Sequence, residues 1–209
     1  MTTRVLGVDP GLTRCGVGVI LAGASRKVSL VSVDTIRTDA SSELVDRIGH
    51  IGEEIEKLIL NVKPSAIAIE RVFSQQNLRS VMGVAQISGV VFMLAHKHAI
   101  PVFLHTPSEV KAAVTGSGRA NKQQVGQMVA KILGLEEVPK PADAADSLAI
   151  AICHAWKSVG GTVSSSSEMT SAQKAWQAAE QNATASKGSW KTSVKESPSC
   201  CTMEPQWAY

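Results

Sequence analysis

The order of its apolar segments most constrains what this chain can fold into. Three strand-like runs come first, at residues 5–9, 16–21 and 27–36. The turn residues Pro10-Gly11 and Gly23-Ala24-Ser25 between them favour an antiparallel meander. Helical and strand-like segments then alternate. They are expected at residues 44–63, 66–70, 75–98, 101–104, 108–114, 121–133 and 143–156. This order predicts an α/β fold with a five-stranded mixed sheet and helices on both faces.

The apolar periodicity stops near residue 160. Residues 1–158 are expected to form one domain, and residues 159–209 a low-complexity tail that is mostly disordered, although it holds three of the four Trp residues. The net charge of +3 is compatible with a nucleic-acid partner but does not identify one. Cys15 and Cys153 have no zinc spacing and resemble core residues of a reducing compartment. With neither a signal peptide nor a membrane span in the pattern, a cytoplasmic protein is expected.

Four carboxylates occupy positions that would suit a metal site. Asp9 and Glu70 each end an apolar run, and Asp143 and Asp146 are three residues apart at the start of a helix, on one face of it. If the first and fourth strands pair in parallel, Asp9 and Glu70 lie side by side. Four acids at such close range cannot all ionise without cations. Two Mg²⁺ ions roughly 3.5–4 Å apart would neutralise them and would clamp the attacking and leaving oxygens of a phosphodiester.

A simpler interpretation makes each acid a turn or cap residue. It is plausible for Asp9, which precedes Pro10-Gly11, and is the better interpretation for Asp143 taken alone. Glu70 is harder to explain in this way, because Glu is a poor turn former. Taken together, the four acids favour a metal site.

Four sequence blocks resemble the RuvC family of bacterial Holliday-junction resolvases. They are Gly7-Val8-Asp9-Pro10-Gly11, Ala68-Ile69-Glu70-Arg71-Val72-Phe73, Thr106-Pro107-Ser108-Glu109-Val110-Lys111 and the run from Asp143 to Ala151. The resemblance spans residues 3–157. It implies an RNase H-like fold, a homodimer, and Mg²⁺-dependent nicking of two opposed strands of a four-way DNA junction, with Mn²⁺ as a substitute metal. It also implies cooperation with the RuvA–RuvB branch-migration machine, and it makes Asp9, Glu70, Asp143 and Asp146 the metal ligands.

The resemblance also suggests roles for basic and aromatic residues. Lys111 and Lys122 fall where the family places cations near the scissile phosphate, and they could stabilise its developing charge. Phe73 matches an aromatic residue that stacks on junction bases. The expected phosphate contacts are Arg71, Arg79 and Arg119. The alternatives are solvated surface Lys and Arg residues, and a core Phe that packs on the helix after it.

Two further segments have a possible DNA-related role. Residues 116–120 could clamp DNA, with Gly116 and Gly118 as hinges, or could simply connect two helices. The helix at residues 75–98 is the candidate dimer interface, because a C₂ dimer would supply two sites for two nicks. The face expected to mediate it holds Gly83, Val84, Ile87, Val90 and Val91. The alternative is that this face packs on the sheet.

Other functions remain open at this point. A pre-ribosomal RNA processing nuclease would cut RNA and show no preference for junctions. An inactive paralogue would bind nucleic acid without cutting it. A sugar-kinase-like ATPase is less well supported, because the chain has no second glycine-rich phosphate loop and no second lobe.

Overall fold

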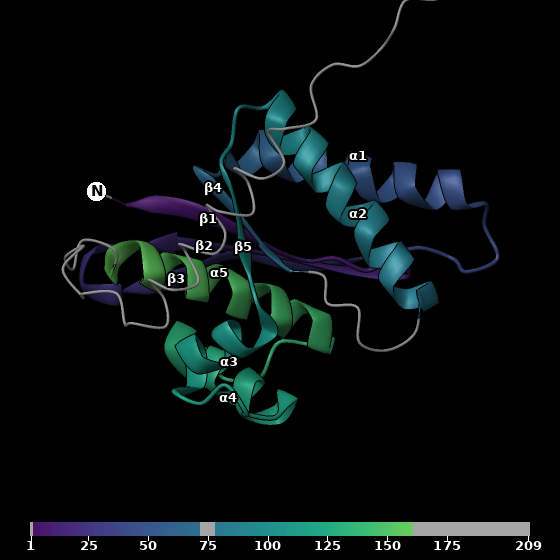
Figure 1. Ribbon diagram of the computed structural model, residues 1–209. Helices are drawn as coiled ribbons and strands as arrows, with labels where there is room; N and C mark the ends of the chain where they lie inside the picture. Colours follow the sequence, from purple (N-terminus) through teal and green to yellow (C-terminus); the bar gives the residue numbers. More distant parts are fainter. Residues whose placement is uncertain (1, 72–77, 161–209) are drawn as a thin grey trace, which may run out of the picture. The chain divides into compact units, whose positions relative to one another are not determined.

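A five-stranded mixed sheet forms the centre of the structure. The computed structural model describes residues 2–71 and 78–160. Strands β1 (Thr3–Asp9), β2 (Arg14–Ala22) and β3 (Val28–Arg37) form the antiparallel meander. Strand β4 (Ala66–Glu70) pairs in parallel with β1, and β5 (Val102–His105) pairs in parallel with β4. The sheet order is β3-β2-β1-β4-β5 (Figure 1), which confirms the predicted mixed sheet.

Helices cover both faces of the sheet, as predicted (Figure 1). Helices α1 (Leu44–Val62) and α2 (Leu78–Lys97) cover one face. Helix α5 (Ala142–Gly160) covers the other, and α3 (Pro107–Thr115) and α4 (Lys122–Leu133) pack against it. A short 3₁₀ turn, Ala24–Arg26, joins β2 to β3. No helix within the described residues has the length and apolar character needed to span a bilayer.

The alternation of side chains along β1 divides the core between the two faces. Leu6 and Val8 lie in the cluster formed with α1 and α2, where Ile51, Ile55 and Ile59 of α1 are fully or almost fully buried. Val5 lies in the cluster formed with α3, α4 and α5. Cys15 and Cys153 are buried and unpaired, and burial raises the pKa of their thiols to about 12 and about 11, so both are inert core residues.

Two details of the helices differ from expectation. Helix α1 begins at Leu44, but its N-cap residue Glu43 makes no capping hydrogen bond through its side chain. The two preceding serines lie in a turn in which Ser41 donates its N–H to the Asp39 carboxylate and Ser42 donates its N–H to the Asp39 carbonyl. From sequence, Ser41-Ser42-Glu43 would be expected to supply the N-cap of this helix. That expectation is wrong, because Glu43 makes no cap bond with its side chain and the two serine N–H groups belong to the preceding turn.

The second difference concerns the face of α2 that was expected to form a dimer interface. Ile87 and Val91 are fully buried against the sheet, and a Cβ added to Gly83 would lie 3.1 Å from the Leu12 side chain. Gly83, Ile87 and Val91 therefore pack inward and are not available to a partner, whereas Val84 and Val90 are half-buried. The exposed large apolar residues of α2 are Met82, Phe92 and Met93.

Candidate active site

Asp9 and Glu70 meet at one edge of the sheet. Val8 is paired with Ile69 across β1 and β4, so the next residues, Asp9 and Glu70, end neighbouring parallel strands. Asp143 lies in the first turn of α5, and Asp146 follows it by three residues. The sheet edge and the start of α5 thus bring together all four carboxylates that the sequence pointed to.

Glycines in the strands let α5 approach the sheet closely. A Cβ added to Gly7 would lie 2.1 Å from the Ser147 carbonyl oxygen, and one added to Gly16 would lie 2.1 Å from the Asp143 carbonyl oxygen. No side chain fits at either place, so the α5 backbone can rest directly on β1 and β2. Gly16 is also the residue opposite Asp9 in the β1–β2 pair, which places Asp143 beside Asp9. No role was predicted for these glycines, although a glycine inside a strand is a signal of such close approach.

Three of the four acids form a compact group. Asp9, Asp143 and Asp146 each offer one carboxylate oxygen, and these three oxygens lie within 4.8 Å of one another. Glu70 is not part of this trio. It lines the adjoining cavity of about 230 Å³ together with Asp9, Asp146, Lys111 and Lys122.

The electrostatics show that this group lacks positive charge. The pKa of Asp9 is raised to about 7, mainly by burial and then by the neighbouring charges of Asp146, Glu70 and Asp143, while Lys122 opposes the shift. Burial also raises the pKa of Glu70, followed by the effect of Asp146, while Lys122 and Lys111 oppose the shift. An acid that is half protonated at neutral pH is an unusual occupant for the end of a strand, and a bound cation would restore its ionised form.

Two basic side chains partly compensate the acids. The Lys122 ammonium lies 3.0 Å from Asp146 Oδ2, and this hydrogen bond raises the pKa of Lys122. The Arg14 guanidinium lies 3.4 Å from Asp143 Oδ2. Both basic side chains are more than half exposed, so each can move away when another cation or a phosphate arrives. Arg14 was not among the predicted site residues, because only the packing of α5 on β2 makes it a neighbour of Asp143.

The donor set fits a hard divalent cation. Every candidate ligand in the trio is a carboxylate oxygen, as is the Glu70 side chain beside it. Mg²⁺ binds through one or two carboxylates while keeping several waters, so a group open to a cavity suits it. The same residues offer no sulfur or imidazole ligand that would favour a softer metal.

The other predicted site residues lie in several places. Lys111 and Lys122 line the acidic cavity. Arg71 is exposed directly after β4, and its N–H donates to the His105 carbonyl. Arg119 is exposed between α3 and α4, away from the cavity wall. Arg79 lies in the first turn of α2, where the side chains are outside the described part, and Phe73 lies wholly outside the described residues. Their roles in binding DNA stay predictions.

Comparison with known proteins identifies the family. The model of a family described as "Crossover junction endodeoxyribonuclease RuvC" matches residues 5–154. A protein of that name from Leifsonia xyli subsp. xyli is 54% identical over 195 residues, which cover 87% of this chain and 94% of the relative. One from Saccharopolyspora erythraea is 57% identical over 154 residues, covering 74% of this chain and 77% of the relative. The chain belongs to the RuvC family.

Solved structures of RuvC proteins agree with this assignment. A structure titled "T. thermophilus RuvC in complex with Holliday junction substrate" matches with a TM-score of 0.73 and 34% identity, covering 77% of this chain and 97% of that one. The yeast mitochondrial Holliday junction resolvase Ydc2 matches with a TM-score of 0.56 at 16% identity, which supports only the shared fold. The RNase H-like fold implied by the resemblance is confirmed. The RuvC match begins in β1 and ends in α5, so it includes all four carboxylates.

Proposed function

We propose that this chain is a Mg²⁺-dependent endonuclease that resolves Holliday junctions by paired, symmetric nicks in recombination and repair of DNA. The acidic group at the sheet edge supports this proposal most directly. It lies in a chain of the RuvC family, and it holds a half-buried carboxylate, Asp9, whose raised pKa of about 7 would favour a bound cation. The fold alone would not define the activity, because related scaffolds carry different reactions.

We assign the metal ligands from their positions. Asp9, Asp143 and Asp146 would hold one Mg²⁺, and Glu70 with Asp9 would hold a second one. When bound, the two ions would lower the pKa of the attacking water and stabilise the departing 3′ oxygen. Mn²⁺, which also takes oxygen ligands, should substitute for Mg²⁺.

The protein's own cations complete this mechanism. Lys122 pairs with Asp146, and its largely exposed side chain lines the same cavity. If a cation were bound at Asp146, Lys122 would be free to stabilise negative charge on a phosphate. Lys111 of α3 lines the same cavity and would act on the same phosphate.

One assay tests the activity. The protein is incubated with a labelled mobile four-way junction, a linear duplex and a single-stranded RNA, each with Mg²⁺ or with EDTA. We expect paired nicks in the junction only, and none in EDTA. Asp9→Asn should keep junction binding and abolish cutting, whereas Asp46→Asn, the same change on an exposed part of α1, should cut normally. Cutting of RNA would favour the alternative ribosomal-RNA nuclease, and binding without cutting would favour an inactive paralogue.

We further propose that the active form is a homodimer that uses the exposed face of α2. Met82, Phe92 and Met93 are 55%, 42% and 55% exposed, and the smaller Ala85 and Gly89 are exposed among them. An apolar face of this kind on one helix marks an interaction surface. Met93→Glu should shift the mass in solution from dimer to monomer. A strict monomer at micromolar concentration, with junction present, would contradict the proposal.

The cellular setting follows from family membership and from the cysteines. We infer that the dimer acts in the cytoplasm, where unpaired thiols such as Cys15 and Cys153 stay reduced. We also infer that it cooperates with the RuvA–RuvB complex on the same junction. Faster resolution by the wild-type protein when RuvA and RuvB are added with ATP would support this cooperation, and an unchanged rate would contradict it.

A further inference from the structure

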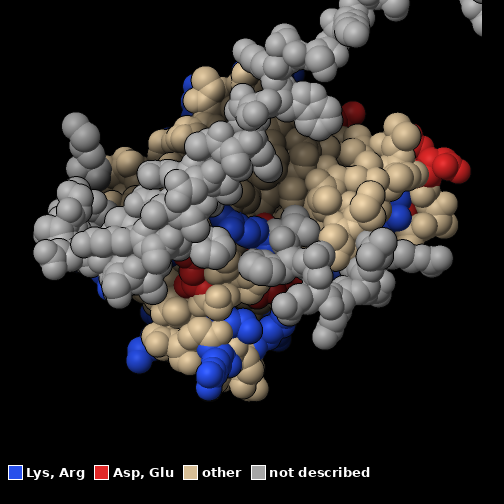
Figure 2. Space-filling view, in the orientation of Figure 1, with Lys and Arg blue, Asp and Glu red and all other residues tan. Residues whose placement is uncertain are grey.

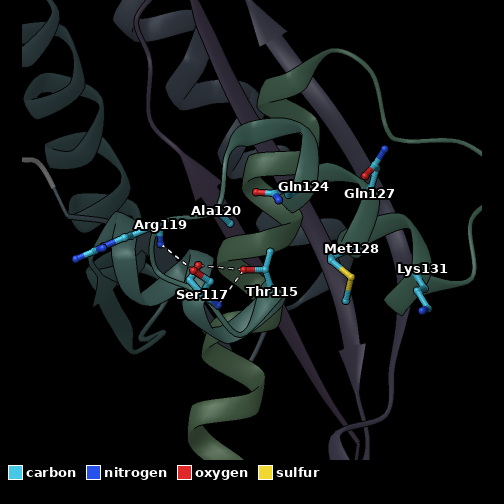
Figure 3. Close-up of a pocket in the computed structure, with 8 residues that line it drawn as sticks. All are labelled: Thr115, Ser117, Arg119, Ala120, Gln124, Gln127, Met128 and Lys131. Carbon is cyan, nitrogen blue, oxygen red and sulfur yellow. Dashed lines mark hydrogen bonds between the residues drawn. The ribbon is translucent and has the colours of Figure 1, made fainter.

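A polar groove of about 650 Å³ lies between the end of α3 and the outer face of α4, and it is separate from the acidic cavity. Figure 3 shows its walls, which come from the end of α3, the connecting turn and α4. Its polar lining consists of Thr115, Ser117, Arg119, Gln124, Gln127 and Lys131. Met128 and Ala120 add an apolar part to the lining. The groove thus combines donors and cations at its rim with a small apolar surface.

The groove carries positive charge and no acid. None of the side chains that line it is Asp or Glu. The segment from Pro107 to Leu133 has four basic residues and one acidic residue, so its net charge of +3 equals that of the whole 209-residue chain. Figure 2 shows basic side chains gathered at the bottom of the view, where Figure 1 places α3 and α4. Such a concentration of charge attracts polyanions.

The side chains in the groove are free to bind a ligand. Within the described residues, Arg119, Gln127 and Lys131 make no side-chain hydrogen bond or ion pair. Gln124 accepts the Asn121 N–H through its Oε1, which leaves its amide N–H groups available. The turn beneath them is well ordered by its own bonds, because Ser117 donates its N–H to Thr115 and its hydroxyl accepts the Arg119 N–H (Figure 3). Gly116 ends α3 in a left-handed conformation with φ of 79°. These bonds hold the turn in the conformation that shapes the groove, and the clamp role of residues 116–120 stays a prediction.

The groove and the acidic cavity have no lining residue in common, but helices α3 and α4 contribute to both. On α3, Lys111 lines the cavity and Thr115, one turn later, lines the groove, with the Thr115 hydroxyl donating to the Lys111 carbonyl. On α4, Lys122 and Val125 line the cavity, while Gln124 and Gln127 line the groove. One turn of α-helix advances about 5.4 Å, and one DNA strand advances about 3.4 Å per nucleotide. A strand whose scissile phosphate enters the cavity can therefore place phosphates in the groove within a few nucleotides.

We propose that this groove binds the sugar–phosphate backbone of the DNA arm that leaves the active site. The proposal rests on the junction-cutting function proposed above, because that function brings DNA to the neighbouring cavity. Arg119 and Lys131 contact phosphates, Gln124 and Gln127 donate from their amides, and Met128 packs against the sugar. Contacts of this type set affinity and register and carry no sequence information.

The test is a set of binding titrations with the full chain in EDTA. A labelled junction and a linear duplex are titrated over a range of NaCl concentrations. Lys131→Glu should reduce the slope of log affinity against log salt by about 1, which corresponds to about tenfold weaker binding near 0.1 M salt. Gln127→Glu, which keeps the size of the exposed side chain, should weaken binding in the same direction. Lys63→Glu makes the matched charge change beyond α1, on the far face of the sheet, and should leave both binding and cutting as in the wild type.

The outcomes separate this inference from the function on which it rests. If wild-type protein with Mg²⁺ does not cut the junction, the proposed function fails. If it does cut, but Lys131→Glu and Gln127→Glu both bind with the wild-type affinity and salt slope, only the groove proposal fails. Weaker binding with an unchanged salt slope would also overturn it, because loss of a phosphate contact must change that slope. Folding of each variant is checked by its thermal unfolding.

Discussion

Replacement of Asp9 by Asn should stabilise the metal-free protein at alkaline pH. The pKa of Asp9 is raised from 3.8 to about 7 in the folded protein. A raised pKa means that folding favours the protonated acid, so the stability that this preference gives is complete below the unfolded pKa and is lost as pH rises through 7. At about 1.36 kcal/mol per pKa unit, the ionised carboxylate at pH 8.5 lowers the free energy of unfolding by at most about 4 kcal/mol. Water in the open cavity reduces the expected loss to about 2 kcal/mol. At pH 5 the cost is at most about 1–2 kcal/mol.

The assay is urea unfolding of wild type and Asp9→Asn in EDTA at pH 5 and pH 8.5. Asn keeps the size of the side chain and cannot ionise. The free energy of unfolding of Asp9→Asn, relative to that of the wild type, should therefore rise by about 1–3 kcal/mol from pH 5 to pH 8.5. Other titrating groups are common to both proteins and cancel in this difference. In a domain of this size, an advantage of about 2 kcal/mol corresponds to about 4–8 °C in melting temperature. Equal stability of the two proteins at pH 8.5, or a lower stability of the variant, would refute the argument that Asp9 lacks a counter-charge.

Three more predictions follow from the same site. Mn²⁺ should raise the melting temperature of the wild type more at pH 8 than at pH 5, because protons compete with the metal for the buried carboxylate; scanning calorimetry measures this, and an equal rise would count against it. Gly7→Ala should lower the free energy of unfolding by about 3 kcal/mol or more, because the added Cβ would lie 2.1 Å from the Ser147 carbonyl oxygen. Gly49→Ala is the control, since a Cβ there would have nothing within 4 Å, and it should be neutral or stabilising. Urea titrations measure both changes. Lys122→Met should slow junction cutting at saturating protein by about 10²–10³-fold while changing binding much less, because it removes a cation that lies 3.0 Å from Asp146; a rate within threefold of wild type would exclude the role.

The sequence predicted the sheet well because its signals there are local. Continuous apolar runs mark β1 and β4 as buried on both faces, and the turns at Pro10 and Gly23 mark the meander. Once the first and fourth strands were paired, the proximity of Asp9 and Glu70 followed from the parallel direction alone. The helix ends were less accurate: α5 continues to Gly160, beyond the expected Trp156, because helix ends have weak sequence signals.

What the sequence missed depends on packing between distant segments. The ion pair of Arg14 with Asp143 exists only because α5 lies against β2, and neither residue has a local signal of it. The face of α2 was assigned wrongly for a similar reason. Its apolar residues surround much of the helix, so periodicity could not tell Ile87, which packs on the sheet, from Met93, which is exposed.

The same packing explains why the pKa of Asp9 is raised. Side chains larger than hydrogen at Gly7 and Gly16 would hold α5 away from the sheet and would let water separate Asp143 and Asp146 from Asp9. With glycine at both positions, the backbone contact desolvates Asp9 and brings like charges to it, which gives its pKa of about 7. The close approach therefore lowers the stability of the metal-free protein at alkaline pH. At the proposed metal site, the same interaction would increase the affinity for a divalent cation. A variant that relieves the repulsion should become more stable without metal and should also bind metal more weakly. A variant that became more stable but bound metal as tightly as the wild type would show that the two effects have different origins.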